Sequence, residues 1–320
     1  MGRRLQKLLV KTRAEAWNKV TPTLYIVAGP TGVGKTAVAI ALAKRLGTVI
    51  VSADSRQCYK NMSIGTAKPS AGELAEVKHY FIDEYPVTTQ LSAADYESLA
   101  LGYLEEIFAK HDSAVLCGGT GLYIKALCEG LDDMPAVNEE IVRQTESEYK
   151  LHGLRWLQDA LQKEDPVFYE QAETQNPARL LRALSFVRST GISMTTFQTN
   201  VRKPRPFRII KTALELPREL LYQRINVRVN KMMEQGLLAE VEKLYPYREL
   251  KNLQTVGYTE LFDFIDGKCT LPVAVDKIKQ HTRNYAKRQM TWFRKDREMA
   301  WFRADDKDLV AKILDIGHNK

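Results

Sequence analysis

The chain has 320 residues, of which 44% are hydrophobic and 9% aromatic, so it can bury a full core and is not wholly disordered. No apolar run reaches the roughly 20 residues that a membrane-crossing helix needs, so we expect no membrane association. The cysteines form no CxxC pair, which excludes a redox dithiol, a zinc finger or a disulfide framework and favours a reducing, cytoplasmic location; they are Cys58, Cys117, Cys128 and Cys269.

The formal net charge of +8 is unevenly distributed along the chain. Residues 1–20 carry six Lys or Arg and one Glu, residues 21–200 carry 16 basic and 22 acidic side chains, and residues 201–300 carry 21 basic and 12 acidic ones. A basic final third indicates either a polyanionic partner or a solvated basic surface, and charge alone does not separate the two.

Strand and helix patterns alternate along most of the chain. Residues 1–20 have the pattern of a basic amphipathic helix, with a mitochondrial presequence as the minor alternative. A helix is predicted over Thr36–Leu46, ended by Gly47. Strands are predicted over Leu24–Ala28, Val49–Val51, Tyr80–Ile82, Ala114–Cys117 and Ile209–Leu216. This alternation predicts an α/β fold with a parallel sheet.

The stretch from about Pro135 to Gly191 differs, because it has helical patterns and no good strand. A helix over Ala178–Thr190 is predicted from its N-terminal Asn-Pro pair and the glycine that follows it, and two more helices are predicted over Arg218–Gln235 and about Val273–Lys295. We therefore expect a basic arm over 1–20, a core over 21–134 and 200–305 with C-terminal helices, a helical insertion over 135–199, and a tail over 306–320.

A glycine-rich loop follows the first predicted strand and consists of Gly29, Pro30, Thr31, Gly32, Val33, Gly34, Lys35 and Thr36. It has the GxxxxGK-Thr pattern of a P-loop, in which backbone N–H groups and a helix start face phosphate oxygens. Lys35 would reach the terminal phosphates and Thr36 could hold Mg²⁺. The alternative is a turn that binds nothing, but its place between a strand and a helix favours phosphate binding and a P-loop NTPase-like core.

An acidic residue is missing where an ordinary nucleotide triphosphatase needs one. The strand Ala114–Cys117 runs into Gly118–Gly121 without Asp or Glu, which weakens the case for ATP hydrolysis. Asp54 instead ends the second predicted strand, at the edge of the sheet that carries the phosphate loop. It is either a general base for an acceptor group or a helix cap.

Several segments together resemble those of the bacterial tRNA dimethylallyltransferase family. They are Gly29–Thr36, Asp54–Tyr59, Ile64–Pro69, Gly118–Tyr123, Val256–Tyr258 and Lys287–Arg294, in this order, and the resemblance runs from about Leu24 to about Trp301. It implies transfer of a dimethylallyl group from dimethylallyl diphosphate to the exocyclic N6 of the adenosine immediately 3′ of the anticodon in tRNA. Mg²⁺ is the implied cofactor, tRNA the partner, and a monomer the expected state.

The resemblance also implies roles for individual residues. Lys35 and Thr36 would bind the diphosphate within the loop Gly29–Thr36, Asp54 would accept a proton from the adenine amine, and Arg228 would assist at the diphosphate. The tRNA contacts implied are Asp54, Ser55, Arg56, Gln57, Ala178, Arg179, Leu180, Leu181, Arg182, Gln254, Thr255, Val256, Gly257, Tyr258, Thr259, Lys287, Arg288, Gln289, Met290, Thr291, Trp292, Phe293 and Arg294.

The basic residues of the last predicted long helix are spaced for one face. Arg283, Lys287 and Arg294 are four and seven residues apart, so we expect them to contact tRNA, with Trp292 largely in the core. From its spacing alone, Arg228 could be only a solvated member of the stripe Arg224–Lys231.

The remaining residue types give weaker signals. Arg179 and Arg182 either contact tRNA phosphates or pair with carboxylates such as Glu173. Cys58 is expected to pack rather than react. The histidines show no metal-ligand spacing and are expected to be structural or on the surface; they are His79, His111, His152, His281 and His318.

Three functions remain open from the sequence. The favoured one is a tRNA prenyltransferase. The alternatives are a small-molecule or nucleoside kinase that uses the same loop, and a non-catalytic RNA-binding protein that senses a nucleotide.

Overall fold

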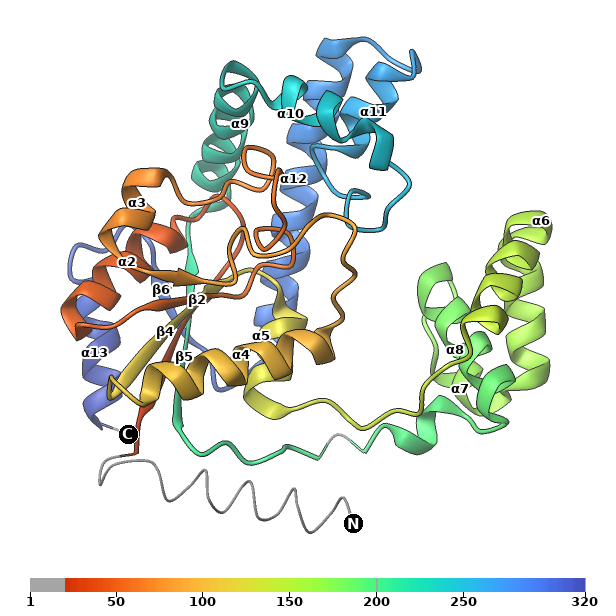
Figure 1. Ribbon diagram of the computed structural model, residues 1–320, viewed down its shortest axis with the longest axis horizontal. Helices are drawn as coiled ribbons and strands as arrows, with labels where there is room; N and C mark the ends of the chain where they lie inside the picture. Colours follow the sequence, from red (N-terminus) through yellow and green to blue (C-terminus); the bar gives the residue numbers. More distant parts are fainter. Residues whose placement is uncertain (1–20, 200, 320) are drawn as a thin grey trace. The chain divides into compact units, whose positions relative to one another are not determined.

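The structure is a computed structural model that describes residues 21–199 and 201–319 (Figure 1). Six strands form a parallel sheet in the order β3-β2-β4-β1-β5-β6. They are β1 (Thr23–Ala28), β2 (Ile50–Ser52), β3 (His79–Tyr80), β4 (Ser113–Gly118), β5 (Arg208–Glu215) and β6 (Ala300–Arg303). The parallel α/β fold expected from the sequence is therefore confirmed, and it is P-loop NTPase-like.

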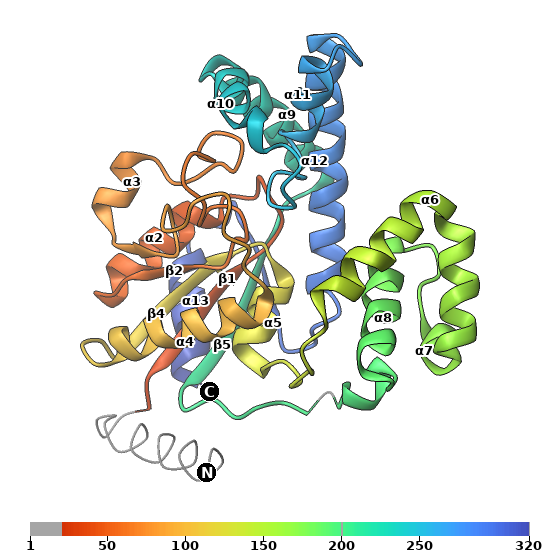
Figure 2. The same cartoon turned by 45° about the vertical axis from the view of Figure 1, so that its right-hand side comes forward.

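Helices cover both faces of this sheet because its central strand buries side chains on both sides. Leu24 and Ile26 of β1 belong to the apolar cluster that includes α4 (Ala93–Phe108) and α5 (Gly121–Glu129). Tyr25 and Val27 point the other way, into the cluster that includes α2 (Lys35–Leu46) and α13 (Leu309–Asn319). Figures 1 and 2 show the resulting three layers.

The strand register places the loops of interest at one edge. Ala28, the last residue of β1, pairs with Gly118 of β4 and with Ala213 of β5. The phosphate loop and the glycine turn after β4 therefore leave the sheet at the same level. Beyond this sheet lie α9 (Arg218–Glu234), α10 (Leu237–Leu244), α11 (Thr259–Ile265) and α12 (Leu271–Phe293), which gather at one end of it (Figures 1 and 2).

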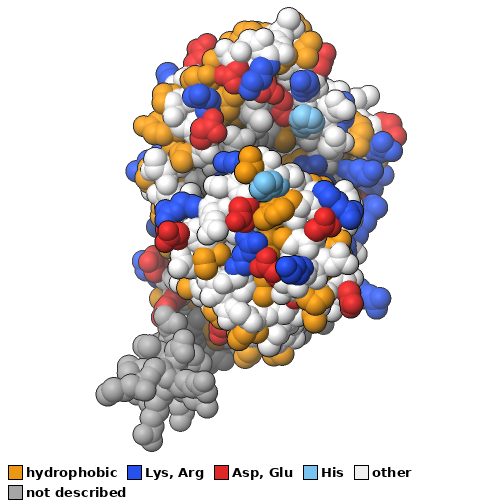
Figure 3. All heavy atoms as spheres, turned by 90° about the vertical axis from the view of Figure 1, so that its right-hand side faces the viewer, with side chains coloured by type: hydrophobic (Ala, Val, Ile, Leu, Met, Phe, Trp, Pro, Cys, Tyr) orange, Lys and Arg blue, Asp and Glu red, His pale blue; other side chains and the backbone are white. Residues whose placement is uncertain are grey.

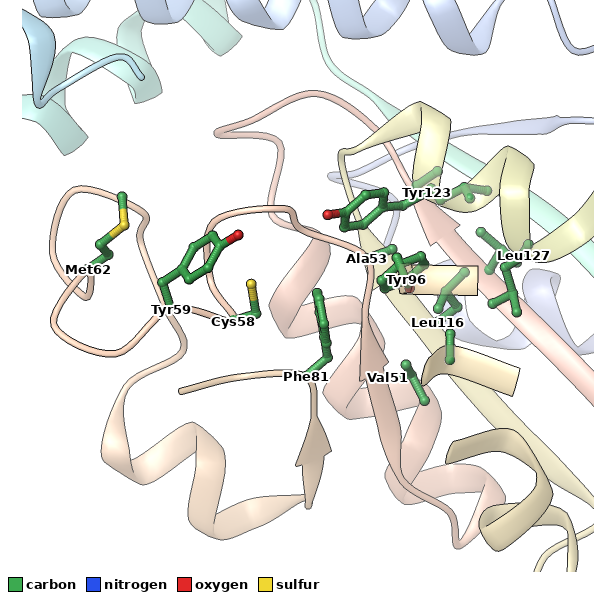
Figure 4. Packing of buried hydrophobic residues seen from close by; sticks show 14 of the residues in the cluster. Val51, Ala53, Cys58, Tyr59, Met62, Phe81, Tyr96, Leu116, Tyr123 and Leu127 are labelled. Carbon is green, nitrogen blue, oxygen red and sulfur yellow. The ribbon is translucent and has the colours of Figure 1, made fainter. Parts of the chain in front are cut away.

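An aromatic cluster supports the loop that follows β2. Tyr96 stacks on Tyr123 with ring centroids 4.0 Å apart, and Phe81 meets Tyr96 edge-on at 5.0 Å. The Tyr96 hydroxyl donates to the backbone oxygen of Ser52 at 3.0 Å. Figure 4 shows these rings beside Ala53, so the residue before Asp54 is packed from several elements at once.

The strands and helices begin and end close to where the sequence predicts, with three differences. The strand expected over Tyr80–Ile82 ends early because Phe81 has a φ of 64°, outside the strand region. The short edge strand β6 was not expected from its sequence. The tail expected over 306–320 contains α13, which buries Leu309 and Ile313, four residues apart on one helix face, against the core.

The chain divides into two compact units, and the second is Glu129–Lys203, which extends past the expected insertion 135–199 at both ends. It contains α6 (Glu139–Glu164), α7 (Pro166–Gln171) and α8 (Pro177–Thr190), with a core that includes Leu157, Phe168 and Leu184. Short helices complete the chain: α3 (Ala71–Glu76), and the 3-10 turns Met194–Phe197 and Tyr245–Tyr247. In the described part of the chain, no helix has the length and apolarity to cross a bilayer. The basic helix expected over 1–20 lies outside the described residues.

Candidate active site

The phosphate loop has the backbone expected of its glycines. Gly34 has a φ of 106° directly before α2, and Gly29 has a φ of 143° with no room for a side chain, since a Cβ there would lie 2.8 Å from the Leu214 oxygen. The Lys35 Nζ donates to the Pro30 oxygen at 2.9 Å. Burial, opposed by nearby Cys117 and Asp54, lowers the pKa of Lys35 to about 8. A half-buried cation in this loop favours an anionic ligand.

Asp54 follows β2 and has two faces. Its Oδ1 accepts the backbone N–H groups of Arg56 and Gln57 at 2.9 and 3.3 Å, which closes the turn after the strand. The residue also lines a cavity of about 750 Å³ together with Thr31 and Arg228. The helix-cap interpretation of Asp54 is wrong, because a turn and not a helix follows it; one oxygen closes this turn while the residue faces an open site.

Two arginines bring guanidinium groups to this cavity. Arg228 of α9 donates from Nη2 to Thr31 Oγ1 at 2.6 Å, and burial lowers its pKa. The Nε atoms of Arg228 and Arg56 are buried without a hydrogen-bond partner among the described residues. Arg228 is therefore not a solvated member of a basic stripe. Unsatisfied, buried guanidinium N–H groups at a cavity are suited to binding an anion.

The turn expected to contact tRNA forms another wall of the cavity. Gln254, Thr255, Val256, Gly257 and Thr259 line it, whereas Tyr258 is fully buried. The loop Gly65–Ala67 lines the cavity as well, and Gln57 braces it by donating from Nε2 to the oxygens of Thr66 and Ala67 at 3.2 and 3.1 Å.

Three residues that the sequence did not single out for a role organise this wall. Glu240 of α10 accepts backbone N–H groups of the 63–65 loop and the Tyr258 hydroxyl. Glu260 is buried and accepts from the Gly257 N–H at 2.7 Å, and its other oxygen lies 2.5 Å from His281 Nδ1. His281 is exposed, as expected for a surface histidine, and it also lines the cavity. No spacing rule connects these residues, which meet only in the fold.

Basic residues of α12 and Arg294, which follows it, line three hollows, one of which contains Arg283, whose Nη1 donates to Asn226 Oδ1 at 2.8 Å. Arg288 lines the Asp54 cavity, and Lys287 and Arg294 line a separate hollow of about 500 Å³ together with Arg218 and Arg303. Basic side chains on both sides of one helix are suited to phosphate contacts along more than one path. In Figure 3, Lys and Arg side chains gather along the right-hand edge of the face shown.

The same helix corrects one expectation and restricts others. Trp292 is 43% exposed rather than in the core; its indole lies against Gly121, where a Cβ would lie 2.1 Å from Cδ1 and Nε1. Gln289 and Phe293 are 6% and 2% exposed, so neither presents a free surface for RNA. Met290 is half-buried and Thr291 is exposed, with its hydroxyl donating to the Lys287 oxygen at 3.1 Å.

The remaining expected residues occupy different surroundings. Ser55 donates its backbone N–H to Thr120 Oγ1 at 3.0 Å. In the second unit, Ala178, Arg179 and Arg182 of α8 are exposed, Leu181 is half-buried and Leu180 is fully buried. Cys58 is buried in the apolar cluster of Figure 4, as expected for a packing residue, and burial raises its pKa to about 12.

Comparison with known proteins gives consistent matches. The family model described as IPP transferase matches residues 57–296. A tRNA dimethylallyltransferase 1 of Phocaeicola vulgatus is 44% identical over 297 residues, which are 92% of this chain and 99% of that protein. The tRNA dimethylallyltransferase 1 of Bacteroides thetaiotaomicron is 46% identical over 275 residues, 86% of this chain and 89% of that protein.

A solved structure agrees with these sequence matches. The full-length tRNA isopentenylpyrophosphate transferase from Bacillus halodurans superposes with a TM-score of 0.67 at 37% identity, covering 93% of this chain and 95% of that one. The match thus extends over nearly the whole length of both chains. The chain belongs to the IPP transferase family.

Proposed function

We propose that the protein transfers a dimethylallyl group from dimethylallyl diphosphate to N6 of the adenosine immediately 3′ of the anticodon in tRNA, releasing diphosphate. The names of its relatives support this reaction, and they do not favour the alternative of a small-molecule or nucleoside kinase. The observation that carries the proposal is that a carboxylate residue and the phosphate loop line one cavity, through Asp54, Thr31 and Arg228.

The donor diphosphate would lie in the loop Gly29–Thr36. Lys35 and the orphaned N–H of Arg228 would stabilise the negative charge that develops on the diphosphate as the C–O bond breaks. Thr36 has a hydroxyl oxygen in the first turn of α2 that would serve as a ligand of Mg²⁺. Oxygens of the donor diphosphate and water would supply the other ligands of the ion. When bound, Mg²⁺ would neutralise part of the diphosphate charge.

The acceptor adenine would enter the same cavity from the side of Asp54. Its amine is a weak nucleophile, because the lone pair is delocalised into the ring, and it loses a proton when it forms the new N–C bond. Asp54 Oδ1 is engaged by the backbone of Arg56 and Gln57, so Oδ2 is the oxygen that would take this proton. The electron pair of the broken C–O bond leaves with diphosphate.

The base must leave its stack to reach Asp54, which costs a few kcal/mol and is easiest in a single-stranded loop. Basic residues of α12 would hold the flanking phosphates: Arg288 at the cavity, and Lys287 and Arg294 outside it. In the second unit, the exposed Arg179 and Arg182 offer further phosphate contacts.

We also propose that the enzyme is cytoplasmic and monomeric. Its cysteines are all free thiols, which fits a reducing compartment.

The variant Asp54→Asn tests the role of Asp54 as proton acceptor separately from its role in holding the turn. Asparagine keeps an oxygen for the N–H groups of Arg56 and Gln57 but replaces the free carboxylate oxygen with an NH₂ group. We expect turnover to fall by about 10², with donor and tRNA affinities within about twofold of wild type. The matched control is Asp112→Asn, because Asp112 is an exposed carboxylate directly before β4, at the amino ends of the strands.

The assay is mass analysis of nucleosides from unmodified tRNA incubated with the enzyme, dimethylallyl diphosphate and Mg²⁺. Prenylated adenosine is expected with wild type and with Asp112→Asn. If the wild-type protein forms no product with any of several tRNAs that have adenosine at that position, the proposal fails. Full activity of Asp54→Asn would leave the transfer reaction standing but remove the role given to Asp54.

A further inference from the structure

Gln289 connects the phosphate loop to the glycine turn after β4. Its Oε1 accepts the backbone N–H of Thr31 at 2.8 Å, and its Nε2 donates to the Gly119 oxygen at 2.9 Å. The side chain is 6% exposed, and a Cβ on Gly119 would lie 2.2 Å from Nε2. The carboxamide therefore fills the gap between the two loops, with each end facing the partner that it can bind.

These contacts determine how Thr31 is held. Gln289 binds the backbone N–H of Thr31, while Arg228 donates to its side-chain oxygen at 2.6 Å. Thr31 is thus fixed at two atoms, in the middle of the loop Gly29–Thr36. Because Gln289 takes this N–H, the loop can direct only its other N–H groups at a ligand.

We propose that Gln289 is a positioning residue of the donor diphosphate site and not a contact for tRNA. It lies in the segment that the resemblance links to tRNA, but it lines neither hollow of that segment, whereas Lys287, Arg288, Met290 and Arg294 do. The inference rests on the proposed function, since it takes Gly29–Thr36 as the donor site. Gln289 acts through Thr31, whose placement sets the shape of that loop.

This role predicts that donor and tRNA affinities respond separately. Gln289→Met keeps the length of the unbranched side chain but leaves the Thr31 N–H and the Gly119 oxygen without partners. The loop should then relax and bind diphosphate about tenfold more weakly, while the exposed basic residues of α12 keep their places. Lys287→Met should show the reverse pattern, and Gln280→Met, an exposed glutamine on the same helix, should change neither affinity.

The experiment measures two affinities for each full-length variant: calorimetric titration with dimethylallyl diphosphate and with inorganic diphosphate, and fluorescence anisotropy with a labelled anticodon stem-loop. A loss of about tenfold in donor affinity, with RNA affinity within about twofold of wild type, is the expected result for Gln289→Met. Loss of RNA affinity alone, equal losses for both ligands, or no loss would each overturn the inference.

A second variant tests the same contact from the opposite side. Gly119→Ala displaces the carboxamide of Gln289 while leaving the sequence of α12 unchanged, so it should reproduce the selective loss of donor affinity. This variant tests the inference if Gln289→Met does not fold. Unchanged donor affinity in a folded Gly119→Ala protein would overturn the inference. If wild type binds diphosphate but transfers no prenyl group, the proposed function fails alone, and the ratio of variant to wild-type affinity still tests Gln289.

Discussion

Substitution of Glu240 tests most directly how the wall of the cavity formed by the 63–65 loop and the turn around Tyr258 is held in place. Its Oε2 accepts the N–H groups of Ser63 and Ile64 at 2.9 and 2.8 Å. Its Oε1 accepts the N–H of Gly65 at 3.0 Å and the hydroxyl of Tyr258 at 2.6 Å. One carboxylate thus holds a loop and a turn that both belong to the site. The informative perturbation is Glu240→Gln, which keeps the size and removes the charge and one acceptor.

The magnitude follows from counting donors. The glutamine oxygen can accept from Ser63 and Ile64, but its NH₂ group then faces the N–H of Gly65, which is left unpaired at a cost of about 1–3 kcal/mol. The surviving bonds also lose their charge assistance. Together these losses favour opening of the 63–65 loop by about 2 kcal/mol, which corresponds to an about 30-fold larger open population. Tyr258→Phe removes a single bond and should cost about 1 kcal/mol.

Hydrogen exchange of the backbone amides at 63–65 is the assay. We expect about 30-fold faster exchange in Glu240→Gln, a smaller increase in Tyr258→Phe, and none in Glu242→Gln, an exposed residue of the same helix. The Michaelis constant for tRNA should rise in the same order, because this loop lines the cavity. An exchange rate in Glu240→Gln within about twofold of wild type would refute the conclusion that Glu240 holds the 63–65 loop in place.

Three further predictions concern charge. Because burial lowers the pKa of Lys35 to about 8 and a bound diphosphate would raise it, donor affinity should be nearly full at pH 7, about half at pH 8 and about tenfold weaker at pH 9 than at pH 7; a flat calorimetric profile would contradict this. Lys287→Met should weaken stem-loop binding and lower its salt slope by about one, and an unchanged slope would place Lys287 off the RNA. Arg188 binds Glu148 and Glu164 at 2.6 and 2.8 Å in the second unit, so Arg188→Met should destabilise that unit by about 1–3 kcal/mol in urea unfolding; no shift would show that solvent screens the network.

The parts of the fold that sequence could predict are those set by local pattern. Leu24–Ala28 is a strand because it is a short apolar run, and the loop after it has glycines where φ is positive. By contrast, β6 is only partly buried at the edge of the sheet, and its four residues carry no alternation to detect. It forms because β5 offers a free edge, which is a property of the folded sheet.

The residues of the candidate site also divide into those that local sequence pattern could predict and those that only the fold brings together. Asp54 could be found because it ends a predicted strand beside the phosphate loop. Glu240 could not, since its partners at 63–65 are about 175 residues away and bind it through backbone N–H groups, which leave no trace in side-chain type. The exposure of Trp292 was missed for a related reason, because only the fold shows that the indole lies against Gly121 and not inside the core.

The missing acid after β4 also has a structural explanation. A Cβ on Gly118 would lie 2.2 Å from the Ala53 oxygen, and one on Gly119 would lie 2.2 Å from Gln289 Nε2. The positions where a nucleotide triphosphatase would place its metal-holding carboxylate are therefore filled: backbone of the β2 loop leaves no room for a side chain at Gly118, and a side chain at Gly119 would have to displace the carboxamide of Gln289. Packing of α12 against this turn closes the sheet edge to that chemistry, while Gln289 ties the same helix to the phosphate loop. A loop that binds an anion without an acid to orient water suits a donor that loses diphosphate to a nucleophile other than water.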